Sequence, residues 1–154
     1  MRILHIASHL NIGGITRYLL GLATRLARRH EVMVAADTGE LRAEFQQAHV
    51  AHWPVPLQTS AEFSPRVWQA AQHLSRRLRR EPVDVLHAHT RVGQVVAACL
   101  SRRLRIPYVA TWHGIYRMNL GRRLWPCAGD RTIAISQPVR EHLLRDIGVP
   151  ASRI

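Results

Sequence analysis

Short apolar runs alternate along this chain with longer segments whose apolar residues recur every three or four positions. Six runs are apolar almost throughout and predict strands that are buried on both faces; they are residues 2–8, 31–36, 50–55, 83–88, 107–112 and 131–135. The segments between them have helical spacing. The first carries Ile15, Leu19, Leu22 and Leu26 on one side, and the others are residues 41–49, 63–80, 92–104 and the stretch after Ser136. Residues 116–125 fit either a loop or a loop with a short helix.

Strands that alternate with helices predict a parallel sheet with helices on both faces. Right-handed crossovers then give the strand order 3-2-1-4-5-6. The expected fold class is α/β, a Rossmann-like three-layer sandwich, with a single domain over residues 1–154. In such a sheet the ligand site lies outside the carboxyl ends of the strands, where the strand order reverses between strands 1 and 4.

The net charge of the chain limits the classes of binding partner to consider. The formal net charge is +12, and every one of the 22 basic residues is an arginine. Arginine grips planar or phosphorylated anions through paired hydrogen bonds. Nucleic acid, an anionic membrane surface and phosphorylated small molecules are therefore the partner classes to consider.

The same sequence indicates a cytoplasmic protein. Two cysteines, Cys99 and Cys127, are too few for a disulfide framework. The apolar run after Arg2 is too short for a signal peptide. No apolar run approaches the ~20 residues that span a bilayer. The arginines leave a peripheral position on the inner face of the membrane as a further option.

Polar residues gather where the predicted strands end. These residues are His9, Asn11, Gly13 and Gly14 after strand 1, His87, His89, Thr90 and Arg91 after strand 4, Thr111, His113 and Gly114 after strand 5, and Ser136 after strand 6. Because the carboxyl ends of parallel strands share one edge of the sheet, these residues outline a polar crevice there.

Gly13 and Gly14 open the helix that follows the first strand. Glycine lets a ligand approach the backbone closely, and the free N–H groups of a helix N-terminus bind anions. A tight turn without a ligand is the alternative. The dinucleotide pattern GxGxxG and the phosphate loop GxxxxGK[ST] are both absent from the sequence, which argues against a nicotinamide oxidoreductase and an ATPase.

The histidines at the strand ends suggest polar contacts rather than a metal centre. His87 and His89 are two residues apart and can point the same way, but two ligands without a nearby acidic residue or cysteine make an incomplete metal site. We therefore expect no metal. His113 stands where strand 5 turns into loop, where it can hydrogen-bond a sugar hydroxyl or a phosphate, or carry a proton.

Taken in order, these segments resemble the N-terminal domain of a family 4 glycosyltransferase of the GT-B architecture. The resemblance rests on the opening strand with Gly13 and Gly14, and on residues 84–89 (DVLHAH), 107–114 (PYVATWHG), 133–136 (IAIS) and 139–143 (VREHL). Each motif is weak alone, whereas their order and spacing are specific.

The resemblance implies transfer of a sugar from a nucleotide-sugar donor to a glycan or lipid-linked acceptor, with retention of configuration and without a metal or other cofactor. It places Gly13 and Gly14 near the donor phosphates and makes His113 the catalytic contact to the transferred sugar. It places the acceptor near Asn11, His87, His89 and Arg91. It further implies that residues 1–154 are the acceptor-side domain, that the C-terminal nucleotide-sugar domain is absent, and that this fragment alone is inactive. Cell-envelope polysaccharide synthesis is the implied setting.

Two other interpretations remain open. The chain could be a free-standing Rossmann-like module that binds anionic ligands or nucleic acid without catalysis. It could also be a small complete transferase in which Asp37, after strand 2, holds a nucleotide. Nucleic acid is disfavoured as a partner because the aromatic residues are not interleaved with arginines in a stacking pattern.

Overall fold

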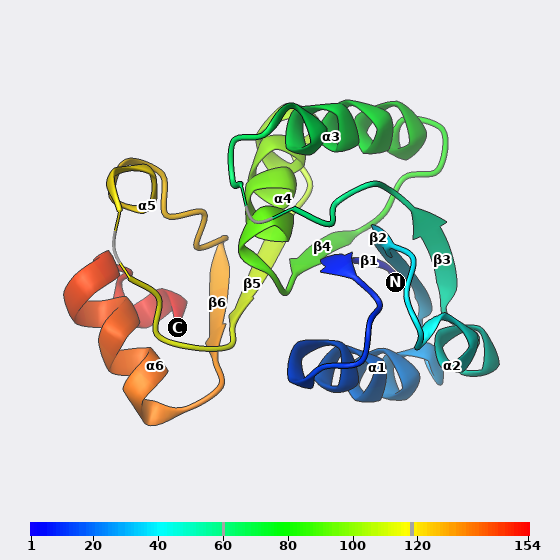
Figure 1. Ribbon diagram of the computed structural model, residues 1–154, viewed down its shortest axis with the longest axis horizontal. Helices are drawn as coiled ribbons and strands as arrows, with labels where there is room; N and C mark the ends of the chain where they lie inside the picture. The colour runs from blue at the N-terminus through cyan, green and yellow to red at the C-terminus, as the bar shows by residue number, and fades with distance from the viewer. Residues whose placement is uncertain (60, 118) are drawn as a thin grey trace.

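The computed structural model of the protein describes residues 1–59, 61–117 and 119–154, and its strands form one parallel six-stranded sheet (Figure 1). The strands are β1 (Arg2–His9), β2 (Glu31–Asp37), β3 (Ala51–Pro54), β4 (Val85–Ala88), β5 (Tyr108–Trp112) and β6 (Arg131–Ala134). Their order is β3-β2-β1-β4-β5-β6, with every neighbouring pair parallel. The predicted order is confirmed, and each strand lies within its predicted run or extends it by one residue.

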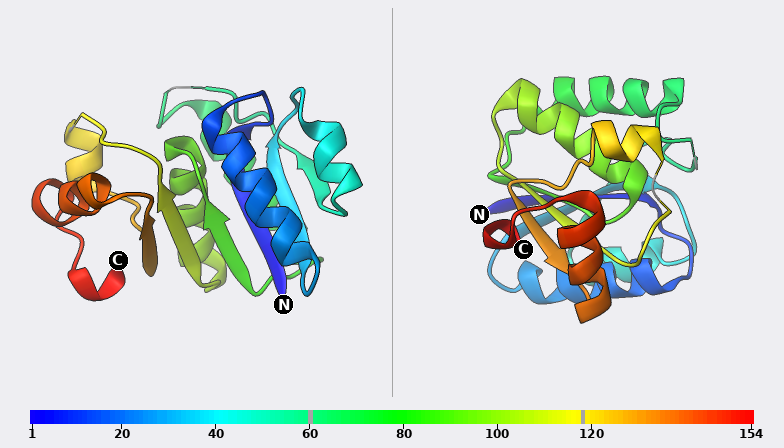
Figure 2. Two further views of the ribbon diagram at one scale, coloured as in Figure 1. Left: turned by 90° about the horizontal axis from the view of Figure 1, so that it is seen from below. Right: turned by 90° about the vertical axis from the view of Figure 1, so that its left-hand side faces the viewer.

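Helices cover both faces of the sheet. In the right-hand view of Figure 2, α1 (Gly14–Ala27) and α2 (Arg42–Gln47) lie on one side, and α3 (Pro65–Leu78), α4 (Arg91–Leu104) and α5 (Leu120–Leu124) lie on the other. The helix α6 (Gln137–His142) follows β6 at the edge of the sheet and continues into a π-helical turn, Leu143–Ile147, and a 3-10 turn, Ala151–Arg153. The three-layer α/β class expected from the sequence is confirmed.

The core has one apolar cluster on each face of the sheet. The larger cluster packs α3 and α4 against the strands through residues such as Leu74, Leu86 and Val96, all fully buried. The smaller cluster packs α1 and α2 through Leu19 and Phe45. Continuous apolar strands are buried on both faces in this way, which is why they do not alternate with polar residues.

The buried side of α1 differs from the predicted one. Thr16, Leu19 and Ala23 are its fully buried residues, whereas Ile15 and Leu22 are half-buried. The smaller residues Thr16 and Ala23 thus take the buried side of the helix that was predicted for Ile15 and Leu22. The predicted helical stripe was therefore correct only at Leu19 and, in part, at Leu26.

Two glycines hold the loops at the carboxyl edge close together. A Cβ atom at Gly39 would lie 2.1 Å from the carbonyl carbon of Leu10, so the loop after β2 packs directly on the loop after β1. A Cβ atom at Gly93, in the first turn of α4, would lie 2.8 Å from the carbonyl oxygen of Ile6. Only glycine permits these approaches without a shift of the backbone.

Ser136 and Gly148 bound the helical segments in the last part of the chain. Ser136 caps α6, and its Oγ accepts a hydrogen bond from the Val139 N–H at 3.4 Å. Gly148 ends the π-helical turn in the left-handed conformation, with φ 78°. The ambiguous segment 116–125 contains the short helix α5; its residue Met118 lies outside the described residues. Within residues 1–59, 61–117 and 119–154, no helix combines the length and apolar character needed to cross a membrane.

Candidate functional site

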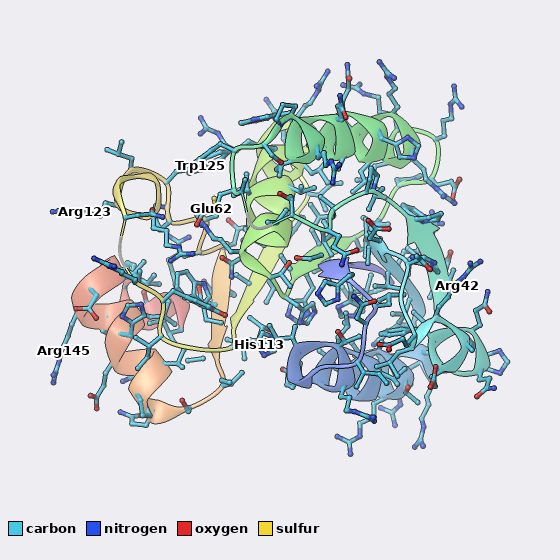
Figure 3. All side chains as sticks on the ribbon, in the orientation of Figure 1. Arg42, Glu62, His113, Arg123, Trp125 and Arg145 are labelled. Carbon is cyan, nitrogen blue, oxygen red and sulfur yellow. The ribbon has the colours of Figure 1, made fainter. Side chains whose placement is uncertain are left out.

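A cavity of about 460 Å³ opens at the carboxyl edge of the sheet. Its walls come from α1, from the residue after β5, and from β6 and the residue that follows it; the lining residues are Gly14, Ile15, Tyr18, His113, Ile133 and Ile135. In Figure 3, His113 lies beside the start of α1. The expectation that residues from the glycine turn and from the end of strand 5 meet at one rim of the sheet is confirmed for Gly14 and His113, whereas Gly13, His87 and His89 do not line the cavity.

The glycine turn leaves the start of α1 accessible. Gly13 is the N-cap residue, with an extended φ of 178°, and no side chain caps the helix. A Cβ atom at Gly13 or Gly14 would meet nothing within 4 Å. The backbone itself thus does not require glycine at these positions, and the missing side chains leave room above uncapped N–H groups, which is where an anion binds a helix.

His113 stands at the mouth of the cavity as a neutral imidazole. It is half-buried, and burial lowers its pKa below the usual value. The ring of Tyr18 approaches it edge-on, with centroids 4.9 Å apart and planes at 79°. Its Nε2 is buried and has no hydrogen-bond partner among the described residues. A neutral imidazole has one donor and one acceptor nitrogen, and because Nε2 is buried, Nδ1 is the nitrogen that can meet a ligand or take part in a proton transfer.

His87 and His89 do not face the cavity openly; they lie in the interior behind His113, together with a third histidine, His5. His5 and His89 are 0 % and 1 % exposed, and His87 is 7 % exposed. His5 Nδ1 and His89 Nε2 share a hydrogen bond of 3.0 Å, and His87 Nε2 and the Thr111 hydroxyl share one of 2.7 Å. We call His5, His87 and His89 the buried trio.

Burial keeps the buried trio uncharged. It lowers the pKa of His5 to about 3 and that of His87 to about 4, and it lowers the pKa of His89 well below the usual value. Repulsion between neighbouring imidazolium charges adds to the effect, since a second charged ring in this space is unfavourable. All three rings are therefore neutral at physiological pH.

Among the described residues, the buried trio is also the one group of three potential metal ligands whose nitrogens lie close together. One nitrogen from each ring lies within 4.8 Å of the others. Neutral imidazoles are good ligands for zinc. In the structure, His5 Nδ1, His89 Nε2 and His87 Nε2 are engaged in hydrogen bonds, whereas His5 Nε2 and His89 Nδ1 are buried without a partner among the described residues. The absence of a metal site remains a prediction, but the two-histidine set of the sequence is joined in the structure by a third potential ligand, His5.

Arg91 and Asn11, the other expected acceptor contacts, have intramolecular partners. Arg91 pairs with Glu62 at 2.9 Å and donates to the carbonyl oxygens of Trp125 and Pro126 at 2.9 and 2.7 Å. Glu62 also pairs with Arg122 at 2.9 Å, and all three charged side chains are at most 16 % exposed. The N–H of Asn11 donates to His9 Nδ1 at 3.2 Å. Arg91 thus ties α4 to the α5 segment rather than pointing freely into the crevice.

Sequence reasoning missed three contributors to this site, namely His5, Tyr18 and the pair Ile133 and Ile135. His5 is one residue of an apolar strand, and only the register of β1 with β4, which sets His5 opposite His87, brings it into the trio. Tyr18 lies one helical turn after Gly14, a spacing that places both on one side of α1. Ile133 and Ile135 alternate along β6, which indicates a shared face.

Fold and site together define the class of the protein: an open parallel α/β domain with a ligand-sized cavity at the carboxyl ends of its strands. Three solved structures share its fold over nearly the whole chain. A glycosyltransferase from Rickettsia africae ESF-5 is 18% identical, with a TM-score of 0.81, and the match covers 99% of this chain and 41% of that chain. Anabaena Alr3699/HepE in complex with UDP-glucose is 22% identical, with a TM-score of 0.75, and the match covers 99% and 42%.

The third structure is the apo form of the lipopolysaccharide outer core galactosyltransferase WaaB, which is 14% identical with a TM-score of 0.74; the match covers 100% of this chain and 44% of that chain. The chain thus spans less than half the length of these proteins. A search of curated proteins gives no match. The family description "Glycosyltransferase Family 4" matches residues 12–154, and the chain belongs to this family.

Proposed function

We propose that this chain is the acceptor-side half of an enzyme that moves a sugar from a nucleotide-sugar donor to a glycan or lipid-linked acceptor. The observation that carries the proposal is that Gly14 and His113 line one cavity at the carboxyl edge of the sheet. Family membership supports it. The UDP-glucose complex of HepE, which has the same fold, supports a nucleotide-sugar donor.

The start of α1 is the proposed contact to the donor phosphates. When the sugar bond breaks, the departing nucleoside diphosphate gathers negative charge. The uncapped N–H groups beyond Gly13 and Gly14 stabilise that charge, because they are fixed in place before the reaction and carry the positive end of the helix dipole.

His113 is the proposed contact to the transferred sugar. Because its ring is neutral, it can donate a hydrogen bond to a sugar hydroxyl without repelling a positive charge that develops on the sugar ring. We propose that the reaction retains the configuration of the sugar and needs neither a metal ion nor another cofactor. The hydrogen bonds that engage the buried trio support the metal-independent course.

We keep Asn11, His87, His89 and Arg91 as the proposed acceptor side of the crevice, with Arg91 acting through its bonds to Glu62 and the α5 segment rather than by direct contact. Of these, Asn11 is half-buried in the loop that leads into α1, where an incoming group can reach it. His87 and His89 act from the interior, where they form the support behind Tyr18 and His113. The shared fold of WaaB, a lipopolysaccharide outer core galactosyltransferase, supports an acceptor of the cell envelope.

We further propose that the donor also needs a second, nucleotide-binding domain, and that residues 1–154 alone do not turn over. A donor held from one side is neither fixed in an attacking geometry nor shielded from water. The transfer is proposed to take place in the cytoplasm, at the inner face of the membrane.

Titration of the isotope-labelled 154-residue chain with UDP-glucose, followed by NMR, tests this proposal. We expect weak binding in which the resonances of Gly14, Tyr18 and His113 shift. The same titration of a Gly14→Val variant, whose side chain enters the free space above α1, should show smaller shifts. Shifts confined to other surfaces, or equal shifts in both proteins, would contradict the assigned site.

A further inference from the structure

We propose that the outer face of α3, together with the end of the α5 segment, docks on anionic lipid bilayers. This inference rests on the proposed position at the inner face of the membrane and assigns a surface to it, and its test does not require sugar transfer. The surface combines four apolar residues with two arginines of one helix face; we call it the tryptophan–arginine face, and its residues are Phe63, Trp68, Arg76, Arg79, Leu124 and Trp125.

Large apolar side chains are exposed together on this surface. Phe63 is 49 % exposed, Trp68 is 46 % exposed and Leu124 is 76 % exposed. Trp125 lies between the two exposed rings, with centroids 6.5 Å from Phe63 and 6.3 Å from Trp68, and the planes within 19° of one another. Three chain segments thus bring their aromatic rings into one cluster at the start of α3. A soluble surface rarely gathers such residues without a partner.

Unpaired positive charge continues the surface along α3. Trp68, Arg76 and Arg79 are spaced by eight and three residues, which places them on the same side of a helix. Both arginines are exposed, and neither forms an ion pair within the part of the chain that the structure describes.

The acidic residues nearest to this surface are already paired. Glu81 pairs with Arg77 at 3.2 Å, and Glu62 is held by Arg91 and Arg122. The sequence has no carboxylate at all within residues 63–80 or 85–129. The field above α3 is therefore positive without local compensation, as binding to an anionic surface requires.

The combination of residues favours a bilayer over other anionic partners. Tryptophan and arginine are the side chains that settle at the boundary between lipid headgroups and acyl chains. An exposed leucine gains by entering the acyl region, whereas a nucleic acid offers it nothing comparable. The opposite side of the sheet provides the contrast, because α1 also exposes Arg25 and Arg28 but no tryptophan or phenylalanine.

Co-sedimentation of the 154-residue chain with vesicles tests the proposal. Vesicles of phosphatidylglycerol and phosphatidylcholine in equal parts are compared with pure phosphatidylcholine, at low and at high salt. We expect binding to the anionic vesicles at low salt, loss of binding at high salt, and little binding to the neutral vesicles.

Matched variants distinguish binding through the tryptophan–arginine face from binding through net charge alone. Each arginine near an anionic bilayer is worth about fivefold in affinity, so the double variant R76Q/R79Q should bind about 30-fold more weakly. The double variant R25Q/R28Q on α1 removes the same charge from the other face and should bind nearly as well as the parent. Trp68→Gln should weaken binding and reduce the quenching of tryptophan fluorescence by brominated lipid.

Three results would overturn the proposal. Equal losses in the two arginine pairs would show attraction to net charge alone. Absence of binding to anionic vesicles at low salt would remove the docking surface. Complete displacement from the vesicles by a single-stranded oligonucleotide at matched charge concentration, with the same dependence on Arg76 and Arg79, would assign the surface to nucleic acid. Circular dichroism confirms that each variant is folded, and the NMR titration with UDP-glucose reports separately on the sugar-transfer site.

Discussion

His113 and the buried trio lie almost in contact, yet the structure gives them opposite environments. The ring centroids of His89 and His113 are 5.9 Å apart. His113 opens onto a cavity and keeps a free imidazole, whereas His5, His87 and His89 are sealed in the core and bonded to one another or to Thr111. Of these four histidines, His113 is the one that lines the cavity, and the trio forms an uncharged interior behind it.

Replacing His113 should have the largest effect on activity. In an enzyme that joins this chain to a nucleotide-sugar domain, we expect His113→Ala to lower kcat by about 10²-fold or more, as loss of a positioned hydrogen-bond donor does. The free energy of unfolding of the 154-residue chain should fall by less than about 1 kcal/mol, because the ring is half exposed. Steady-state kinetics and urea denaturation measure the two quantities. His73→Ala on the exposed side of α3 is the control, and parental turnover in His113→Ala would refute the role.

Replacing His5, in contrast, should mainly lower the stability of the fold. His5→Ala leaves a cavity in a fully buried position and deprives His89 of its 3.0 Å hydrogen bond. We expect the free energy of unfolding to fall by about 2–4 kcal/mol. Urea denaturation of the 154-residue chain measures this loss. A change below that of His113→Ala would show that the trio does not support the core in the way its burial indicates.

The sequence predicts the sheet and the edge at which these histidines meet, but not which of them are buried. The six apolar runs suffice for the strand order, and the strand-end rule is enough to bring Gly14 and His113 to one edge. No sequence pattern singles out His5. It is polar in the middle of an apolar strand, and its approach to His87 follows from the pairing of β1 with β4, a tertiary fact. The depth at which His87 and His89 lie depends equally on how Tyr18 and His113 cover them.

The same limit applies to the glycines and to α1. Gly13 and Gly14 stand out in the sequence as a pair, but the close backbone contacts require glycine at Gly39 and Gly93, whose neighbours Leu10 and Ile6 lie far away in the sequence. The buried side of α1 includes the smaller residues Thr16 and Ala23, whereas hydrophobic spacing alone selected larger ones. Patterns along the chain thus predict elements and their edges, whereas close approaches between loops require the folded structure.

Acid should weaken the fold through the buried trio. The unfolded chain takes up a proton on His87 near pH 6.5, whereas the folded chain does so only near pH 4, because burial and the charge of His113 oppose it. The unfolded state therefore binds more protons between these values, and the free energy of unfolding falls as the pH falls from 6.5 to 4. His87 alone accounts for about 3 kcal/mol over this window.

Urea denaturation at a series of pH values measures this slope. In His87→Gln the dependence on pH should become shallower, although the protein is less stable at neutral pH. His73→Gln changes an exposed histidine and should keep the parental slope. An unaltered slope in His87→Gln would show that folding does not lower the pKa of His87.

Added or removed metal should have the smallest effect on stability. This prediction tests whether the buried trio binds an ion or only supports the core. A zinc ion needs imidazole nitrogens about 2.0–2.1 Å away, so the three rings would have to move together around it, and an ion held by the nitrogens that are now hydrogen-bonded would displace the bonds of His5 to His89 and of His87 to Thr111. We expect neither zinc nor EDTA to change Tm in a thermal unfolding scan at neutral pH. An ion present at a hundred times its Kd would instead add about 2.7 kcal/mol of stability and raise Tm by several degrees. If zinc raises Tm in the parent protein but not in His5→Gln, the trio is a metal-ligand set. Its hydrogen bonds are then those of the metal-free site.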